Sequence, residues 1–123
     1  MKKLISLALI VSIGIIFSSC DKPDVLDREA KLKIENTSTS NYITGVYYGT
    51  VGPGTENRIS SNIGPGESKT FTLNIKDDSV YDIKITCDNT DVGDFNETHH
   101  DFWWNETYVI ELTNTSWYDD EEW

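Results

Sequence analysis

The chain is poor in the residues that build cross-links and catalytic centres. Its 123 residues include only two cysteines, two histidines and three prolines. Two cysteines cannot form a disulfide framework or supply a cysteine-rich zinc site. The sequence also lacks a phosphate-binding glycine loop, a nucleophile elbow and a zinc signature. We therefore expect no catalytic residues, no metal and no cofactor.

Basic side chains are scarce as well. The full sequence has ten lysines and arginines against 21 aspartates and glutamates, a net charge of −11. Such an acidic chain is repelled by phosphate backbones, which excludes nucleic acid as a partner. The same charge is compatible with a basic protein partner, which it would steer into contact, or simply with solubility.

Long apolar runs are absent except at residues 4–17. This run is too short for a membrane span, which needs about 20 apolar residues. Lys2 and Lys3 precede it and two serines followed by Cys20 end it, which is the order of a secretory signal peptide over residues 1–19. The Phe-Ser-Ser-Cys ending resembles the lipobox of Bacteroidetes-type lipoproteins. The resemblance implies cleavage before Cys20, diacylglycerol on its sulfur and anchoring at the outer membrane, facing the periplasm or the surface.

Cleavage there would leave 104 of the 123 residues, the size of one ordinary domain. Removing Lys2 and Lys3 leaves eight basic side chains against 21 acidic ones, a net charge of −13. Residues 20–30 are charged and contain a proline, so we expect a flexible tether between the lipid and the domain. A disulfide between Cys20 and Cys87 is the alternative to lipidation, and the charged tether directly after Cys20 disfavours it.

Polar and apolar residues alternate in short runs from residue 31 onward. This period of two predicts strands at residues 31–36, 69–75, 80–88 and 107–113, with a further strand at 41–49. No window shows helical spacing, and Gly64-Pro65-Gly66 predicts a tight turn between two of the strands. The sequence predicts one antiparallel β-sandwich of about seven strands, Ig-like or Greek-key in type, over residues 31–118. Residues 119–123 are expected to form an acidic tail.

Several of these segments resemble small uncharacterised bacterial extracytoplasmic β-sandwich domains. The matching residues are Ile-Glu-Asn-Thr at 34–37, Val-Tyr at 46–47, Asn57, Ile-Gly-Pro-Gly-Glu-Ser at 63–68 and Tyr-Asp-Ile-Lys at 81–84. The resemblance implies a sandwich fold and supplies no activity.

Three features could indicate a catalytic or metal-binding site, and each also has a structural interpretation. Cys87 shares its strand face with apolar residues and is expected to be a core residue. His99 and His100 point to opposite faces of any strand and lack further ligands, so we expect a surface turn there. Residues 88–97 form an acidic loop that does not match an EF-hand, and an irregular calcium site stays an open alternative.

All four tryptophans lie in the last 21 residues. Strand parity predicts that Phe102 and Trp104 point inward and Trp103 outward. Exposed Trp103, Trp117 and Tyr118 are therefore candidate ligand-binding residues. Exposed indoles beside carboxylates could stack on a glycan or anchor a protein interface. Alternatively, Trp104 and Trp117 complete the core and the tail is disordered.

Asp78-Ser79-Val80 resembles the short O-glycosylation motif of Bacteroidetes extracytoplasmic proteins, which makes Ser79 a candidate acceptor. The sequence as a whole favours an envelope-anchored, non-catalytic binding module. Its partner would be a basic protein, in an inhibitor or immunity-type role, or a glycan.

Overall fold

The computed structural model describes residues 28–123. The expected signal peptide, Cys20 and most of the expected tether lie outside the described residues. The seven strands are β3 (Glu29–Asn36), β4 (Ile43–Gly49), β5 (Ser68–Asn74), β6 (Val80–Cys87), β7 (Phe95–Asp101), β8 (Thr107–Leu112) and β9 (Trp117–Glu122). No helix in residues 28–123 is long and apolar enough to cross a membrane.

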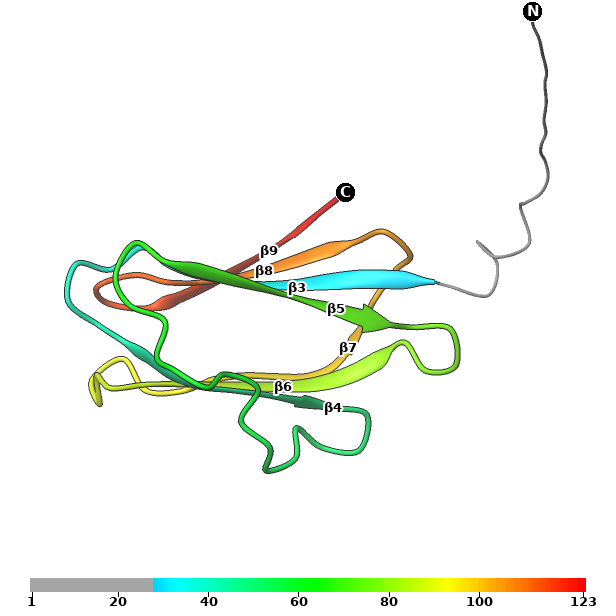
Figure 1. Ribbon diagram of the computed structural model, residues 1–123, viewed down its shortest axis with the longest axis horizontal. Coiled ribbons are helices and arrows are strands. Elements are labelled where there is room, and N and C mark those ends of the chain that lie inside the picture. The colour runs from blue at the N-terminus through cyan, green and yellow to red at the C-terminus, as the bar shows by residue number, and fades with distance from the viewer. Residues whose placement is uncertain (1–27) are drawn as a thin grey trace, which may run out of the picture.

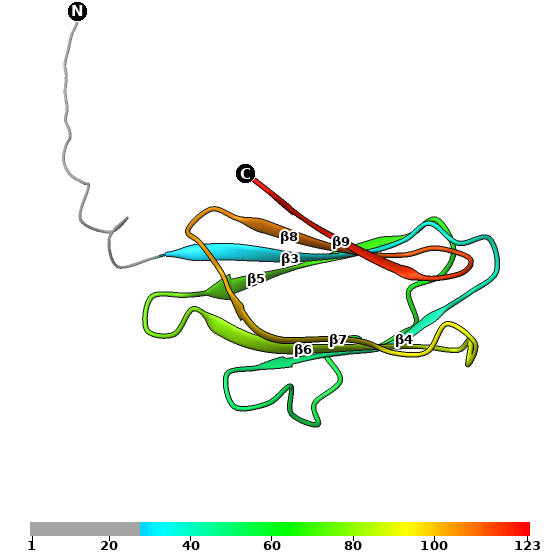
Figure 2. The ribbon, with the colours of Figure 1, turned by 180° about the vertical axis from the view of Figure 1, so that it is seen from behind.

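The strands form two sheets, of order β5-β3-β8-β9 and β4-β6-β7. The sheets lie as two layers with the core between them (Figure 1), and the chain crosses from one layer to the other after β7 (Figure 2). The predicted all-β sandwich is therefore confirmed. One pair, β3 with β8, is parallel, whereas the other four pairs are antiparallel. The strand order also differs from that of an immunoglobulin constant domain, where the first two strands share a sheet.

The core follows from the alternation in the sequence. Leu32 and Ile34 of β3, Ile83 and Ile85 of β6, and Ile110 of β8 are almost fully buried, as their parity predicts. The remaining buried apolar side chains of this cluster are Ala30, Ile43, Val46, Ile59, Ile63, Leu73, Ile75, Phe102, Tyr108 and Leu112. The chain from Asp21 onward contains this entire cluster, and a domain of about 100 residues can fold on a core of this kind.

A buried polar joint lies where the chain leaves β3 and crosses to β4. The Asn36 amide group donates hydrogen bonds to the carbonyl oxygens of Asn41 (2.8 Å) and Ile63 (2.9 Å). Its Oδ1 accepts from the backbone N–H and the hydroxyl of Ser38, at 3.1 and 2.6 Å. The segment between β3 and β4 lies outside the sheets, and the Asn36 side chain supplies hydrogen-bond partners for its buried backbone groups.

The predicted turn at Gly64-Pro65-Gly66 is confirmed. Glu67 N–H donates to the Gly64 carbonyl at 3.0 Å, and Gly66 has φ of 81°. These are the features of a type II turn with proline second and glycine third. A residue with a Cβ would be strained at Gly66.

Two strands and one boundary differ from the sequence analysis. The expected loop and surface turn over residues 95–101 is strand β7, and the expected acidic tail is strand β9. β9 pairs with β8 from Leu112↔Trp117 to Thr107↔Glu122, so β8 provides the partners for its inward backbone groups although its side chains from Tyr118 onward are exposed. A charged edge strand of this kind also resists pairing with other chains. At the N-terminal end of the domain, β3 begins at Glu29 and not at residue 31, because Ala30 is buried on the same face of the strand as Leu32.

Candidate functional site

Two adjacent exposed tryptophans lie at one end of the sandwich, in the turn between β7 and β8, and a third, Trp123, follows β9. Trp103 is 67% exposed and Trp104 60% exposed. Both line a shallow groove of about 250 Å³, together with the polar side chains of Arg28, Ser79 and Asp101. We call this groove, with those five residues, the tryptophan groove.

The turn that carries the two indoles is fixed by backbone contacts. Asn105 N–H donates to the carbonyl of Glu29 at 2.9 Å, and Lys31 N–H donates to the carbonyl of Glu106 at 2.8 Å. Asn105 has φ of 67°, so the chain turns back sharply here. Because β7 ends at Asp101, strand parity does not extend into this turn. The prediction that Phe102 points inward is confirmed, whereas the inward prediction for Trp104 is wrong.

The structure does not bring the three predicted binding residues together. Trp117 is half-buried, packs on Phe95 with ring centroids 5.9 Å apart, and donates its indole N–H to the Gly93 carbonyl at 2.9 Å. It is a structural residue, as the alternative interpretation held. Tyr118 is exposed but pairs with Glu111, four residues along β8 from the start of that strand at Thr107. Four residues of strand span roughly 13 Å, which separates Tyr118 from the tryptophan groove.

Two larger hollows, of about 380 and 390 Å³, flank the turn at residues 64–68. Their linings are aliphatic and polar, without an aromatic side chain, and a third hollow of about 280 Å³ is lined by one aromatic side chain, that of Tyr47. Size alone would favour them. We favour the smaller tryptophan groove because ligand sites combine apolar surface with a few converging polar groups.

Ser79 lies at the end of the β5–β6 turn and is half-buried. Its hydroxyl donates a hydrogen bond to Asp101 Oδ1 at 2.8 Å, and its carbonyl accepts from Phe102 N–H at 2.9 Å. The candidate O-glycosylation residue therefore borders the tryptophan groove.

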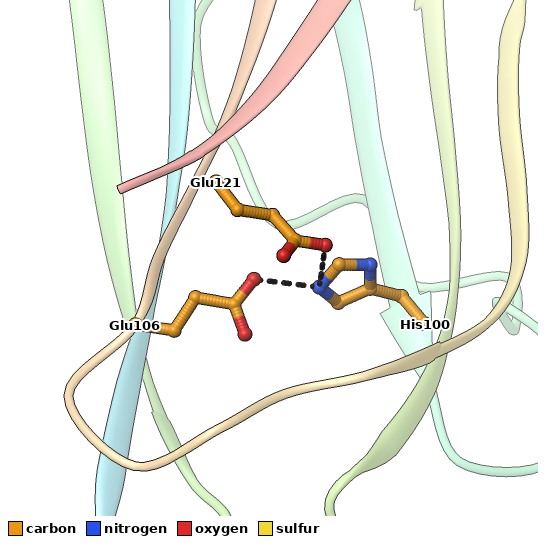
Figure 3. A group of neighbouring side chains, drawn as sticks. All are labelled: His100, Glu106 and Glu121. Atoms are coloured by element: carbon orange, nitrogen blue, oxygen red, sulfur yellow. Dashed lines mark hydrogen bonds and ion pairs between the residues drawn. The ribbon is translucent and has the colours of Figure 1, made fainter. Parts of the chain in front are cut away.

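A second cluster lies beneath the turn, where three side chains from separate elements converge (Figure 3). His100 Nε2, on β7, is 2.8 Å from Glu106 Oε2 and 3.8 Å from Glu121 Oε2 on β9. His100 Nδ1 is 3.9 Å from a carboxylate oxygen of Glu97. One imidazole thus faces three carboxylates. We call His100, Glu106 and Glu121 the His–Glu cluster.

Packing holds the members of this cluster in place. The His100 ring stacks on Tyr108, with centroids 3.9 Å apart and planes 6° from parallel. The second oxygen of Glu106 accepts the Trp103 backbone N–H at 2.8 Å. Tyr108 donates its hydroxyl proton to Asp119 at 2.7 Å, and burial together with this carboxylate raises the pKa of Tyr108 far above its usual range. The tyrosine is therefore a protonated, fixed platform for the histidine.

The two adjacent histidines have different environments. Thr98 and His99 together stand opposite Asp82, in a bulge between Tyr81↔His100 and Ile83↔Glu97. His99 is exposed, with φ of 61°, and its backbone N–H and ring Nδ1 both contact Asp82 Oδ1. His100 is buried, so the expected surface turn is wrong for it. The bulge resets the strand parity and turns His100 inward.

Cys87 packs against the core, as predicted, but is only half-buried. Its Sγ lies 3.3 Å from the Gly93 carbonyl and 3.5 Å from the Asn89 carbonyl. Burial, the largest cause, and the carboxylates of Asp88 and Asp94 raise the pKa of Cys87. A thiol with a raised pKa is a poor nucleophile at neutral pH.

We therefore expect Cys87 in the native domain to react with a thiol reagent at pH 7.5 at least about tenfold more slowly than after unfolding in urea. Timed alkylation followed by mass spectrometry measures both rates. Equal rates would show that the thiol is neither protected nor held protonated.

The acidic loop at residues 88–97 does not gather its carboxylates. Within residues 28–123, the groups of three or more His, Cys, Asp or Glu side chains close enough to share an ion reduce to the His–Glu cluster. In the loop, Asn89 Oδ1 instead accepts the Asp91 backbone N–H at 2.9 Å.

Comparison with known proteins adds no functional assignment. No protein-family model matches the chain, and a search of curated proteins finds none that matches it.

Arg28, Glu106 and Glu121 were not predicted from the sequence as site residues. Arg28 falls in the expected tether and Glu121 in the expected tail, and the sequence pattern assigned no role to Glu106. Only the pairing of β3 and β9 with β8 brings these side chains to the two sites. The one local signal is the position of Glu106, which directly precedes the alternating run from Thr107. A carboxylate at the end of a buried strand indicates that a polar partner lies nearby.

Proposed function

We propose that this chain is a lipid-anchored protein of the bacterial cell envelope, held at the outer membrane through Cys20, and that its sandwich acts by binding rather than by catalysis. We propose that its ligand is a glycan and that the tryptophan groove binds it. The observation that carries this proposal is the pair of adjacent exposed indoles beside Arg28, Ser79 and Asp101. Large exposed apolar groups rimmed by polar ones mark interaction sites.

The chemistry of the groove suits a sugar. An indole offers a flat apolar face against which the C–H face of a pyranose ring can stack. The Asp101 carboxylate can accept hydrogen bonds from sugar hydroxyls, and the Arg28 guanidinium can donate them. The groove is smaller than the 300–1,000 Å³ typical of enclosing ligand pockets, so it would hold the end of a glycan chain rather than surround it.

Ser79 belongs to the same proposal as an O-glycosylation acceptor. A glycan attached to its hydroxyl would replace the hydrogen bond to Asp101 and occupy the groove. Binding is therefore measured on unmodified protein, with its intact mass verified.

A basic protein is the second candidate ligand, in an inhibitor or immunity-type role. The observation in its favour is β9, an edge strand with four consecutive exposed carboxylates at residues 119–122. A positively charged partner would be drawn to this edge by long-range attraction.

The test uses the chain from Asp21 onward on a glycan array and then in titrations with the glycan that binds best. Trp103→Ala and Trp104→Ala should each weaken binding about tenfold or more, since a central aromatic anchor carries much of the energy of an interface. Tyr118→Ala is the matched control, because this exposed aromatic residue lies away from the groove, and it should leave the affinity within about twofold.

Salt separates the two candidates. Raising the salt concentration from 0.15 M to 1 M shortens the screening length from about 8 Å to about 3 Å. Stacking on a sugar should hardly change, whereas capture of a basic protein by the acidic edge should weaken steeply. Binding that Tyr118→Ala removes and the two tryptophan variants retain would reject the groove.

A further inference from the structure

We propose that the His–Glu cluster is a binding site for a divalent first-row transition metal ion, with Zn²⁺ as its best probe. The inference is independent of the proposed glycan function. It begins from the convergence of one imidazole nitrogen and two carboxylate oxygens, all within 4.8 Å of one another, from β7, the β7–β8 turn and β9. Two of the three side chains, those of His100 and Glu106, are buried.

The distances suit a single ion. Zn²⁺ binds histidine nitrogen and carboxylate oxygen at 2.0–2.2 Å, which places tetrahedral ligand atoms about 3.3 Å apart. The observed separations from His100 Nε2, 2.8 Å to Glu106 and 3.8 Å to Glu121, lie on either side of that value. Glu121 is half-exposed and can adjust, and water would complete the coordination from its side.

The carboxylates around His100 also favour a bound cation. Glu106 is completely buried, and a buried carboxylate needs compensation. His100 alone can offset at most one of the three carboxylates that face it, those of Glu97, Glu106 and Glu121. A dication between His100, Glu106 and Glu121, with the imidazole neutral as a ligand, would offset two of the three, and Glu97 near Nδ1 would act as the outer partner that metal-bound histidines commonly have.

The donor set selects the class of ion. Calcium and magnesium prefer all-oxygen sites, whereas an imidazole nitrogen favours zinc and its neighbours. Stacking on Tyr108 and the hydrogen bond from Trp103 N–H to Glu106 fix two ligands before any ion binds. A bound ion would join the edge strands β7 and β9 of the two sheets and would tie down the turn that carries Trp103.

The experiment uses the chain from Asp21 onward, stripped with a chelator, dialysed and titrated with ZnCl₂ in a calorimeter and in thermal melts. We expect one Zn²⁺ per chain and a rise in Tm of about 10 °C at a hundredfold excess over Kd, reversed by chelator. Co²⁺ should give a visible absorption band, because a nitrogen and oxygen site of low symmetry makes its d–d transitions intense. Ca²⁺ at the same concentration should leave Tm unchanged.

Matched variants localise the ion. Glu121→Gln should weaken Zn²⁺ binding about tenfold or more, and this half-exposed side chain can be replaced without disturbing the core. Glu122→Gln, which removes the same charge one residue further along β9, should change the affinity less than twofold. His100→Ala should abolish the Co²⁺ band. Equal effects of the two glutamate variants would overturn the proposal in favour of diffuse attraction of cations to β9. An absent Zn²⁺ response would overturn it in favour of a purely structural His–Glu contact, and an equal Ca²⁺ response would overturn the preference for a transition metal.

Discussion

Replacing Asn36 with alanine is expected to lower the free energy of unfolding by about 3–5 kcal/mol, a large part of the 5–15 kcal/mol typical of a domain. The side chain is 1% exposed and makes four hydrogen bonds. Alanine would remove all four hydrogen bonds, each worth about 1 kcal/mol, and would leave the Ser38 N–H buried without a partner, which costs about 1–3 kcal/mol. The Ile63 carbonyl keeps the hydrogen bond from Ile43 N–H. The effect exceeds that of an ordinary surface substitution several times over.

Urea unfolding followed by tryptophan fluorescence measures this loss. Asn74→Ala is the matched control, since Asn74 also ends a strand and accepts a backbone N–H, that of Lys76, but is exposed to water. We expect the control to lose less than about 1 kcal/mol. Similar losses for the two variants would show that the joint at Asn36 is no more important than an exposed strand end.

Replacing Cys20 with alanine is expected to abolish lipid attachment altogether. Two acyl chains contribute about 0.8 kcal/mol per buried methylene, which suffices for stable anchoring, and no other residue is proposed to carry them. Cells grown with a clickable fatty acid should label the native protein and not the Cys20→Ala variant. Cys87→Ala is the control, because it removes the other cysteine and should be labelled normally. Label lost from Cys87→Ala or kept by Cys20→Ala would contradict the lipoprotein interpretation.

The strands predicted correctly are those in which one face is apolar. In β3, β6 and β8, alternate residues such as Ile34, Ile83 and Ile110 enter the core, and burial of that face decides both the strand and its orientation. The turn at residues 64–67 could also be predicted from the sequence, because proline and glycine determine the backbone conformation locally.

The strands that were missed, β7 and β9, are the edge strands on one side of the sandwich. Their sequences, Phe-Asn-Glu-Thr-His-His-Asp and Trp-Tyr-Asp-Asp-Glu-Glu, show no apolar alternation. Pairing with the neighbouring strand forms them, and that information is held in β6 and β8. An edge strand needs few apolar side chains, so a method based on alternation does not detect it.

The candidate sites were missed in part for the same reason. Trp103 was predicted to be exposed, but Trp104 was assigned inward because parity was continued past the end of β7 at Asp101. His100 and Glu121 are 21 positions apart and meet only because β7 and β9 lie at neighbouring edges of facing sheets. Contacts between elements of this kind leave no local pattern in the sequence.

The most direct test of the binding surface is an NMR titration of the indole N–H signals of the chain from Asp21 onward with the glycan selected on the array. The indoles of Trp103 and Trp104 should shift together and saturate with one affinity. The indole of Trp117, which is hydrogen-bonded to Gly93, should stay in place as an internal reference. Saturable binding that leaves both groove signals unmoved would contradict the account.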